Sequence, residues 1–293
     1  MSLDDAVGRF AEAVGTTGPV TVTGTGSRGG PIPGVRTVVP PAGVEWVQAA
    51  EMTVRCGAGT TVAALDDALA EVGQCVAIPD TGTVGGALAV GHSGVRRLGW
   101  GPVRDTVLQV RYVAASGQVV TAGGPTVKNV SGFDLCRLLV GSRGTLGFLS
   151  ELILRTRPRP ANEAWFTSDR DPLELLRGLY RPTSILWDGH QTWVLLDGHH
   201  DDVDHQVRAF RLGSVDGPPP LPPHRWSIAP STVCSLGDRL DGRFVAEVGV
   251  GTVHAEHPMP RRPIDPGVAD LHRRLKHEFD PTGRLNPGLD VLA

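Results

Sequence analysis

Glycine is the residue type whose spacing in this sequence points most clearly to a ligand-binding site, because it is concentrated in three loops of the first half of the chain. The loops are residues 24–29, residues 79–94 and residues 141–147. Glycine adopts positive φ and has no side chain, so successive N–H groups of such a loop can surround a phosphate oxygen. Three separated loops therefore indicate an extended ligand held mainly by main-chain atoms. The alternative is an irregular β domain in which the glycines serve only tight turns.

The first loop matches the G-x-G-x-x-G pattern of dinucleotide-binding sites, but the residues after it do not. In a nicotinamide-binding Rossmann domain, a helix begins inside the loop and points its N-terminal amides at the pyrophosphate. Here Pro31 and Pro33 follow within Gly-Gly-Pro-Ile-Pro-Gly, so no helix can begin there. A Rossmann dehydrogenase is therefore the weaker alternative, and NAD binding without flavin would support it.

The spacing of the histidine, acidic and cysteine residues indicates solvated or buried side chains and not metal ligands. The densest mixed cluster stands at the start of an expected helix and contains His199, His200, Asp201, Asp202, Asp204 and His205. Such alternation is typical of a solvated helix face. The four cysteines lie far apart with no C-x-x-C pair, which argues against iron–sulfur clusters and zinc ribbons. We expect them to be small buried hydrophobic residues.

The overall composition excludes several classes of protein. The 293 residues include 28 Lys+Arg and 31 Asp+Glu, a formal net charge of −3, which offers no electrostatic footprint for nucleic acid or an anionic membrane surface. The apolar runs are too short to span a bilayer, and the acidic N-terminal segment lacks the features of a signal peptide. We therefore expect a cytoplasmic protein without a transmembrane segment.

Hydrophobic spacing predicts the elements that would position the glycine loops. Residues 1–15 are typical of an amphipathic helix, and residues 62–73 of a second helix capped by Thr60 or Thr61. Residues 107–113 and 119–121 alternate like a hairpin around Ser116-Gly117. Short strands are expected at residues 18–23, 35–39 and 52–59, and strands interrupted by glycine clusters from residue 75 to residue 151.

The composition changes after Pro158, where tryptophan, histidine and proline become more frequent. Residues 198–213 are expected to form a helix, and residues 215–226 a loop or linker because of their prolines. Residues 268–279 predict a final helix, which the turn formers of residues 280–288 end.

Three stretches of sequence together resemble a known family of flavoproteins: residues 83–108, residues 123–154 and residues 279–288. The most specific part combines Lys-Asn-Val-Ser-Gly-Phe-Asp at 128–134 with Gly-Ser-Arg-Gly-Thr-Leu-Gly at 141–147. The chain resembles the FAD-binding domain of the vanillyl-alcohol oxidase/p-cresol methylhydroxylase (PCMH-type) superfamily, with the nearest likeness to the glycolate oxidase (glycolate dehydrogenase) E-subunit family. The likeness runs through residues 18–157 and the short tail, and is vague over residues 160–265.

The resemblance implies an α+β fold in three parts. Residues 1–158 would form a PCMH-type FAD-binding domain of two subdomains, residues 159–265 a smaller, shortened α+β cap or substrate domain, and residues 266–293 a segment that returns to the FAD domain. The cofactor would be noncovalent FAD. Relatives with covalent flavin have a histidine where this chain has Ser27, and a cysteine that is absent around residues 91–94.

The resemblance also assigns cofactor contacts to all three loops and to the tail. The first pyrophosphate loop would consist of Gly24, Thr25, Gly26, Ser27 and Arg28. The residues that follow FAD from its phosphates toward the ring would be Pro79, Thr83, Gly85, Gly86, His92, Ser93 and Gly94. The ADP half would meet Gly144, Gly147 and Leu149, and Asn286 would lie near the flavin edge.

The catalytic base stays unidentified, with His92 as the candidate and a structural or flavin-contacting role as its alternative. Related D subunits carry a G-D-G-N-x-H metal motif where His254 and His257 lie, but this chain reads Gly249-Val-Gly251-Thr-Val-His254 and lacks the aspartate and asparagine. We therefore predict no metal site. Lys128 is the single lysine of the first 275 residues, and it lies in the most specific motif, residues 128–134. Asp134 of the same motif is expected to cap a helix.

The resemblance implies an FAD-dependent oxidoreductase acting on CH–OH groups, as the FAD-binding subunit of a glycolate oxidase-like 2-hydroxy-acid dehydrogenase. Its implied partners are a small 2-hydroxy acid, a second flavoprotein and an iron–sulfur subunit, through which it could associate with a membrane. The alternative is a noncatalytic flavoprotein or assembly subunit that needs a partner for chemistry, because the second domain is short for the family. Turnover by the isolated chain would separate the two.

Overall fold

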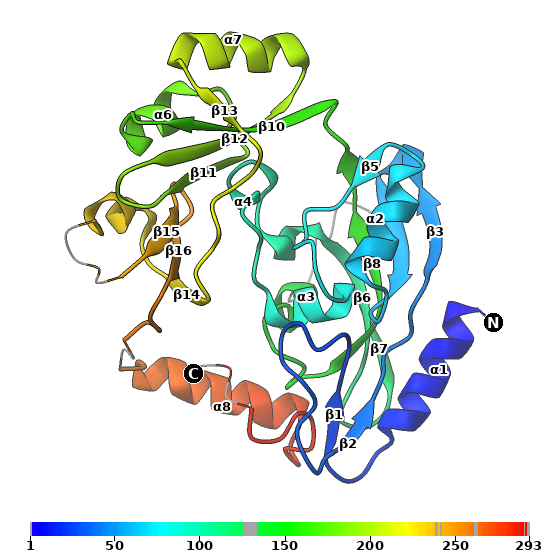
Figure 1. Cartoon of the computed structure of the whole chain (residues 1–293). Coiled ribbons are helices and arrows are strands. Elements are labelled where there is room, and N and C mark those ends of the chain that lie inside the picture. The colour runs from blue at the N-terminus through cyan, green and yellow to red at the C-terminus, as the bar shows by residue number, and fades with distance from the viewer. Residues whose placement is uncertain are drawn as a thin grey trace. The chain divides into compact units, whose positions relative to one another are not determined.

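The computed structural model describes residues 2–125, 134–237, 240, 242–260, 263–289 and 291. Its helices and strands divide into two compact units, each assembled from separate stretches of the chain (Figure 1). Unit 1 contains residues 1–94, 102–159 and 263–293, and unit 2 contains residues 95–101 and 160–262. The short segment 95–101, which we expected in the first domain, thus groups with the second unit.

A five-stranded antiparallel sheet of order β3-β4-β8-β6-β7 forms the centre of unit 1. Its strands are β3 (Val44–Gln48), β4 (Thr53–Gly57), β6 (Val107–Val113), β7 (Val119–Gly123) and β8 (Phe148–Arg155). Because side chains alternate along a strand, one face directs Val54, Val110 and Leu152 into the main core. The predicted hairpin is confirmed as β6–β7, with Val110 opposite Ala122.

Helices and short strands complete unit 1. The helices are α1 (Leu3–Val14), α2 (Val62–Ala70), α3 (Val84–Val90), α5 (Leu135–Leu139) and α8 (Pro266–Phe279), with 3-10 turns η1 (Ala49–Glu51) and η2 (Val103–Thr106). Strand β1 (Val20–Val22) pairs in parallel with β2 (Arg36–Val38), and β5 (Gln74–Cys75) pairs with β9 (Arg157–Pro158). The hydroxyl of Thr61 accepts from the amide of Ala64, which confirms the predicted cap of α2.

The second glycine loop differs from expectation, because residues 84–90 form helix α3 and not a strand. The side chain of Thr83 caps this helix by accepting from the amide of Gly86 at 3.1 Å. Gly91, at φ 71°, ends it in the left-handed region. Leu88 is buried in the main core. The helix was missed because glycine has a low helix propensity and this segment is rich in glycine.

Unit 2 is built on a seven-stranded sheet of order β13-β10-β12-β11-β15-β16-β14 (Figure 1). The strands are β10 (Asn162–Ser168), β11 (Ser184–Trp187), β12 (Thr192–Gly198), β13 (Gly213–Val215), β14 (His224–Ser227), β15 (Phe244–Glu247) and β16 (Thr252–Ala255). Helices α6 (Pro172–Gly178) and α7 (His200–Phe210) pack their apolar side chains on one face, together with the 3-10 turn η3 (Pro230–Ser235). Short α4 (Arg97–Trp100) also belongs to this unit.

The expectation of a loop over residues 215–226 was wrong at both ends, since Val215 ends β13 and residues 224–226 lie in β14. The prolines end at Pro223, so the following amides are free to pair with β16. Arg225 lies directly opposite His254 in that pairing.

The cysteines are buried or partly buried, as expected: Cys56, Cys75 and Cys136 are buried and Cys234 is intermediate. Burial raises the pKa of Cys56 to about 12 and that of Cys136 to about 11, so both thiols stay protonated at neutral pH. In the part of the chain that the structure describes, no helix is both long and apolar enough to cross a membrane.

A buried arginine ties the C-terminal segment to helix α1. Arg284 is 5% exposed and donates to the carbonyl oxygens of Val14 at 2.6 Å and Gly15 at 3.1 Å, where α1 ends. It also donates to the carbonyls of Thr17, Gly18 and Ala115. One guanidinium thus satisfies carbonyl groups that the helix end leaves without an intrahelical partner.

We expect Arg284→Leu to lower the free energy of unfolding by about 3 kcal/mol, because several buried carbonyl oxygens lose a charged donor. The matched control is Arg274→Leu on the exposed side of α8, where only an ion pair with Asp270 is lost and the expected cost is about 0.5 kcal/mol or less. Urea unfolding followed by circular dichroism measures both. Equal losses in the two variants would contradict the role given to Arg284.

Candidate cofactor-binding site

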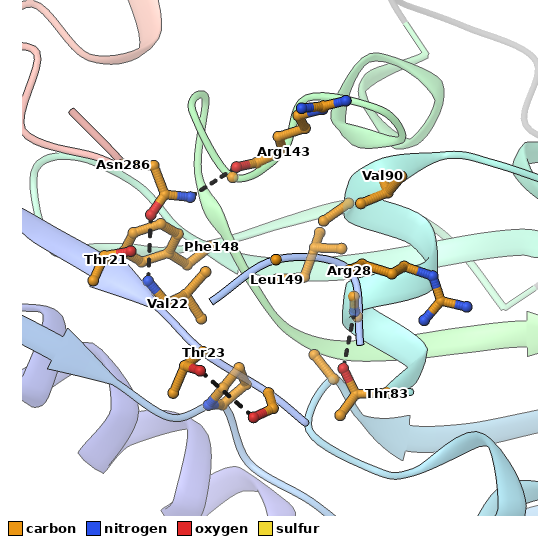
Figure 2. Close-up of a pocket in the computed structure, with 18 of the residues that line it drawn as sticks. Thr21, Val22, Thr23, Arg28, Thr83, Val90, Arg143, Phe148, Leu149 and Asn286 are labelled. Carbon is orange, nitrogen blue, oxygen red and sulfur yellow. Dashed lines mark hydrogen bonds between the residues drawn. The ribbon is translucent and has the colours of Figure 1, made fainter. Parts of the chain in front are cut away.

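A cavity of about 380 Å³ opens in unit 1 where the three glycine loops and the C-terminal tail meet. Figure 2 shows side chains from all these segments around it, among them Thr23 just before the first loop, Arg28 within it, Thr83 before α3, Arg143 and Asn286. The segments are distant in sequence, so the fold brings them together. The volume lies within the range of small-molecule and cofactor sites.

The first loop offers unused hydrogen-bond donors. The amides of Thr25, Gly26 and Ser27 make no hydrogen bond with any residue that the structure describes. Arg28 lines the same cavity, and its Nη1 is buried with no partner among the described residues. Burial lowers the pKa of Arg28, which marks a charge that lacks full hydration. Free amides beside an uncompensated cation are suited to hold a phosphate.

Helix α3 gives the cavity its shape and does not supply phosphate donors. The amides of Val84, Gly85 and Gly86 are already bound to the oxygens of Thr60, Ala58 and Thr83, at 2.9, 2.8 and 3.1 Å. A Cβ on Gly85 would lie 2.7 Å from the Cβ of Ala58. The glycine at the start of α3 is therefore needed for close packing of the helix against the wall of the cavity.

Asn286 joins the tail to two other walls of the cavity. Its side-chain oxygen accepts from the amide of Val22 at 3.3 Å, and its nitrogen donates to the carbonyl of Arg143 at 2.7 Å (Figure 2). Its backbone has φ 45°, a left-handed conformation that asparagine tolerates better than most residues. Gly144 lies beside it, and a Cβ there would be 2.8 Å from the Asn286 nitrogen.

Lys276 and Asp280 hold the tail in this place. The Lys276 Nζ donates to the carbonyl of Thr145 at 2.8 Å, to the carbonyl of Leu285 at 3.1 Å and to Asp280 at 2.6 Å. Asp280 is 2% exposed, and its carboxylate also accepts from the amides of Arg284 and Leu285. We call this set the Lys276–Asp280 clamp. It connects the third glycine loop to the segment that carries Asn286.

Most of the residues assigned by the resemblance line this cavity. Those that do are Gly24, Thr25, Gly26, Ser27, Arg28, Thr83, Gly85, Gly86, His92, Gly144, Gly147, Leu149 and Asn286. Pro79, Ser93 and Gly94 are not among its lining residues. The Ser93 hydroxyl instead accepts from the amide of Val103 at 3.0 Å, a contact that shapes the chain after α3.

Sequence reasoning missed a further group of lining residues: Thr21, Val22, Thr23, Gly29, Gly30, Ile32, Pro40, Ala58, Ala89, Val90, Arg143, Phe148 and Leu289. Some of them carried a signal. Ala89 and Val90 follow Gly85 and Gly86 at helical spacing, and Arg143 stands inside the Gly-Ser-Arg-Gly motif. Ala58 and Pro40 come from separate segments, and only the tertiary fold brings them to the site.

Of the other polar residues considered from the sequence, His92 lines the cavity. The cluster at residues 199–205 lies at and after the exposed start of α7, where His200 contacts Asp204. Lys128 falls outside the described residues, whereas Asp134 caps α5 by accepting from the amide of Arg137. Within the described ranges, no three or more His, Cys, Asp or Glu residues are grouped so as to hold a metal ion.

Two family profiles match the chain. One describes an FAD binding domain and covers residues 4–123, and the other describes the C-terminal domain of FAD linked oxidases and covers residues 233–289. The chain is thus similar to FAD-linked oxidases over these two stretches. The first match spans two of the three glycine loops that line the cavity, and the two matches indicate FAD as the cofactor.

Curated relatives match this chain over part of their own length. A D-lactate dehydrogenase of Archaeoglobus fulgidus is 38% identical over 144 residues, which are 46% of this chain and 32% of that enzyme. The glycolate oxidase subunit GlcE of Escherichia coli is 38% identical over 115 residues, which are 38% of this chain and 33% of the subunit. The matches thus span about a third of each relative.

A solved structure shows the fold over almost the whole chain. An alkyldihydroxyacetonephosphate synthase superposes with a TM-score of 0.70 at 16% sequence identity and covers 98% of this chain and 75% of its own. The predicted α+β fold with a PCMH-type FAD-binding domain is confirmed by this likeness and by the profile match.

The residues of the cavity fit FAD. The first loop and Arg28 leave donors and a charge unused, as a pyrophosphate requires. Strands β1 and β8 add an apolar wall that includes Val22, Phe148 and Leu149, as the ring systems of FAD require. Main-chain amides carry no net charge, so a phosphate site built from them needs no excess of basic residues. The net charge of −3 is therefore compatible with FAD binding.

We expect Arg28→Met to weaken FAD binding about 10- to 100-fold, the loss of one charge-assisted contact worth about 1.5–3 kcal/mol. Arg9→Met, on the exposed side of α1, is the matched control and should leave the affinity unchanged. Titration of the apoprotein with FAD, followed by quenching of flavin fluorescence, gives both dissociation constants. Equal affinities for Arg28→Met and wild type would refute the contact.

Gly147 is a position where the main chain comes close to a buried side chain, and this predicts how a substitution there changes stability and FAD affinity. A Cβ on Gly147 would lie 2.4 Å from Cδ2 of the buried Tyr112, so Gly147→Ala should cost about 2 kcal/mol of stability and lower FAD affinity as the wall shifts. Gly8→Ala in α1 meets nothing within 4 Å and should stabilise the protein by about 0.5–1 kcal/mol. Thermal unfolding and FAD titration of both variants test this contrast.

Proposed function

We propose that this protein is an FAD-dependent oxidoreductase that oxidises a small 2-hydroxy acid, as the FAD-binding subunit of a glycolate oxidase-like dehydrogenase. The cavity of unit 1 is the observation that carries the proposal, because its loop amides and the buried Nη1 of Arg28 have no partner among the described residues. The names of the relatives, a D-lactate dehydrogenase and a glycolate oxidase subunit, support the substrate class.

The residues of the chain would divide the work of holding the cofactor. FAD, when bound, supplies the acceptor for the hydride that leaves the substrate carbon. The amides of residues 25–27 and Arg28 would hold the pyrophosphate, while Phe148, Leu149 and Val22 would exclude water beside apolar parts of the cofactor. Ser27 offers no side-chain nucleophile of the type that links flavin in covalent relatives, so the cofactor would be noncovalent.

A noncatalytic flavoprotein or assembly subunit is the second candidate. The relative from Escherichia coli is itself one subunit of a glycolate oxidase, and among the described residues that line the cavity, His92 is the single histidine that could act as a base. Under either proposal, the partners would be a second flavoprotein and an iron–sulfur subunit, and any membrane association would come through them.

We expect the FAD-loaded protein to lose its visible flavin absorption when glycolate or D-lactate is added without oxygen, because a 2-hydroxy acid reduces the flavin. Acetate and propionate are the controls, since they have the carboxylate but no hydroxyl. Loss of absorption with the hydroxy acids alone supports the enzyme. Stable absorption with every acid would favour the noncatalytic subunit, and a protein that takes up no FAD would refute both candidates.

A further inference from the structure

Two arginines and two carboxylates form a compact group on the outer face of the unit 1 sheet, the face that points away from the main core. Arg111 of β6 lies directly opposite Glu151 of β8, and Arg55 of β4 lies opposite Ile153, two residues further along β8. Because side chains alternate along a strand, the two arginines and Glu151 project to the same side. The fourth member, Asp4, comes from the first turn of α1.

Glu151 forms the buried half of this group. It is 1% exposed, and its Oε2 accepts from Nη2 of Arg55 at 2.7 Å and from Nη1 of Arg111 at 3.0 Å. One buried carboxylate thus holds two guanidinium groups side by side and neutralises one of their two charges. The other positive charge is left for a second anion.

Asp4 supplies that second anion from the solvent side. Its Oδ1 accepts from Nη2 of Arg55 at 2.9 Å and from Nη1 of Arg111. The hydrogen bond from Arg111 lowers the pKa of the Asp4 carboxyl, so this group is ionised at neutral pH. The Asp4 side chain is nevertheless 61% exposed, and the helix N-terminus favours its negative charge even when the ion pairs are broken. Asp4 can therefore leave the arginines at little cost.

Both guanidinium groups keep donors that the two carboxylates do not use. Arg55 and Arg111 each donate through one nitrogen only, and Nε of Arg55 is buried without a partner among the described residues. A guanidinium has five N–H donors and binds a carboxylate best through two parallel hydrogen bonds to its two oxygens. Asp4, which is fixed to α1 and contributes a single oxygen, does not make that contact.

The group lies in an open cavity of about 480 Å³, which shares no lining residue with the cofactor cavity. Trp46 and Ile153 give this outer cavity its apolar surface. Gln48, Gln109 and Thr121 also line it, and their side chains make no hydrogen bond within the described ranges. A ligand in the outer cavity therefore meets one pair of cations and several neutral polar groups, which suits an acid whose remaining part is polar and uncharged.

We propose that Arg55 and Arg111 form a binding site for the carboxylate of a small organic acid, and that Asp4 occupies this site when no acid is bound. The two oxygens of the acid accept from both guanidinium groups, where Asp4 contributes one oxygen. Asp4 then turns into solvent, and Glu151 keeps the two arginines in place.

The uncharged part of the acid meets the amide side chains of Gln48 and Gln109. An acid that carries an amide or a hydroxyl therefore fits better than one with a hydrocarbon chain alone. The site requires neither FAD nor a 2-hydroxy acid, so it goes beyond the proposed function and does not rest on it.

The test uses N-acetylglycine, which joins a carboxylate to one neutral amide, with N-acetylglycinamide as the control ligand that lacks the charge. Both are titrated into the full-length protein, as purified, at constant ionic strength. The nitrogen–proton NMR signal of the Trp46 indole, identified by its absence from a Trp46→Phe variant, reports binding in the outer cavity. We expect a saturable shift with the acid and none with the amide.

Two substitutions in one helical turn test the role of Asp4. Asp4→Asn removes the competing carboxylate and should bind N-acetylglycine about 5-fold more tightly than wild type, the factor by which an exposed ion pair of this kind occupies the site. Asp5→Asn removes the same charge from the same turn of α1 without touching the arginines, and it should bind as wild type does. Both residues are exposed, so both variants are expected to fold.

A third substitution tests the arginines. Arg111→Gln, introduced together with Asp4→Asn, should weaken binding about 10- to 100-fold relative to Asp4→Asn alone, because a charge-assisted contact is lost. An unfolding midpoint near that of Asp4→Asn shows that the double variant is intact. If the double variant does not fold, the comparison of Asp4→Asn with Asp5→Asn decides.

Four results would overturn the proposal. They are an unchanged Trp46 signal in Asp4→Asn, equal shifts with the acid and the amide, equal affinities of Asp4→Asn and Asp5→Asn, and undiminished binding in the folded double variant. Inorganic phosphate that displaces N-acetylglycine at a lower concentration than acetate does would overturn the assignment to a carboxylate. Each result is independent of whether the protein oxidises a 2-hydroxy acid.

Discussion

The cofactor cavity of unit 1 depends on an ion pair that lies beyond its wall. Lys276 and Asp280 are one helical turn apart at the end of α8, and together they fix the carbonyl of Thr145 and the backbone of Arg284 and Leu285. The segment that follows then places Asn286 against β1 and the third glycine loop. A partly buried pair of this kind is effective because each remaining donor and acceptor finds a backbone partner. Residues separated by more than a hundred positions are thereby held in one wall.

In the proposed function, main-chain amides hold much of the pyrophosphate, which would explain how an acidic protein binds this doubly charged group. Loop amides with no partner in the described part of the chain lie near Arg28, and the glycines at α3 and in the third loop let main chain approach where a side chain would collide. Among the described residues, Arg28 Nη1 is a buried donor without a partner, and Arg28 lines the cavity. The packing of unit 1 leaves this donor available to a ligand.

Local signals in the sequence predicted much of the fold, and tertiary contacts decided the rest. Amphipathic spacing predicted α1, α2 and α8, and the alternation around Ser116-Gly117 predicted the β6–β7 hairpin. Helix α3 was missed because its glycines looked like a loop, although Thr83 caps it and Ala58 packs against it. Family motifs led to loop residues of the cavity, but Lys276, Ala58 and Pro40 reach it through contacts that no local pattern encodes. In unit 2, the proline run hid the start of β14, and with it the pairing of Arg225 with His254.

We expect unit 1 to bind FAD noncovalently in the cavity between its glycine loops. The decisive measurement is the absorption spectrum of the purified protein before and after denaturation and filtration. The native protein should be yellow with flavin absorption bands, the denatured polypeptide should be colourless, and FAD should appear in the filtrate. A colourless native protein that takes up no FAD on titration, or a flavin that stays attached to the denatured chain, would contradict it.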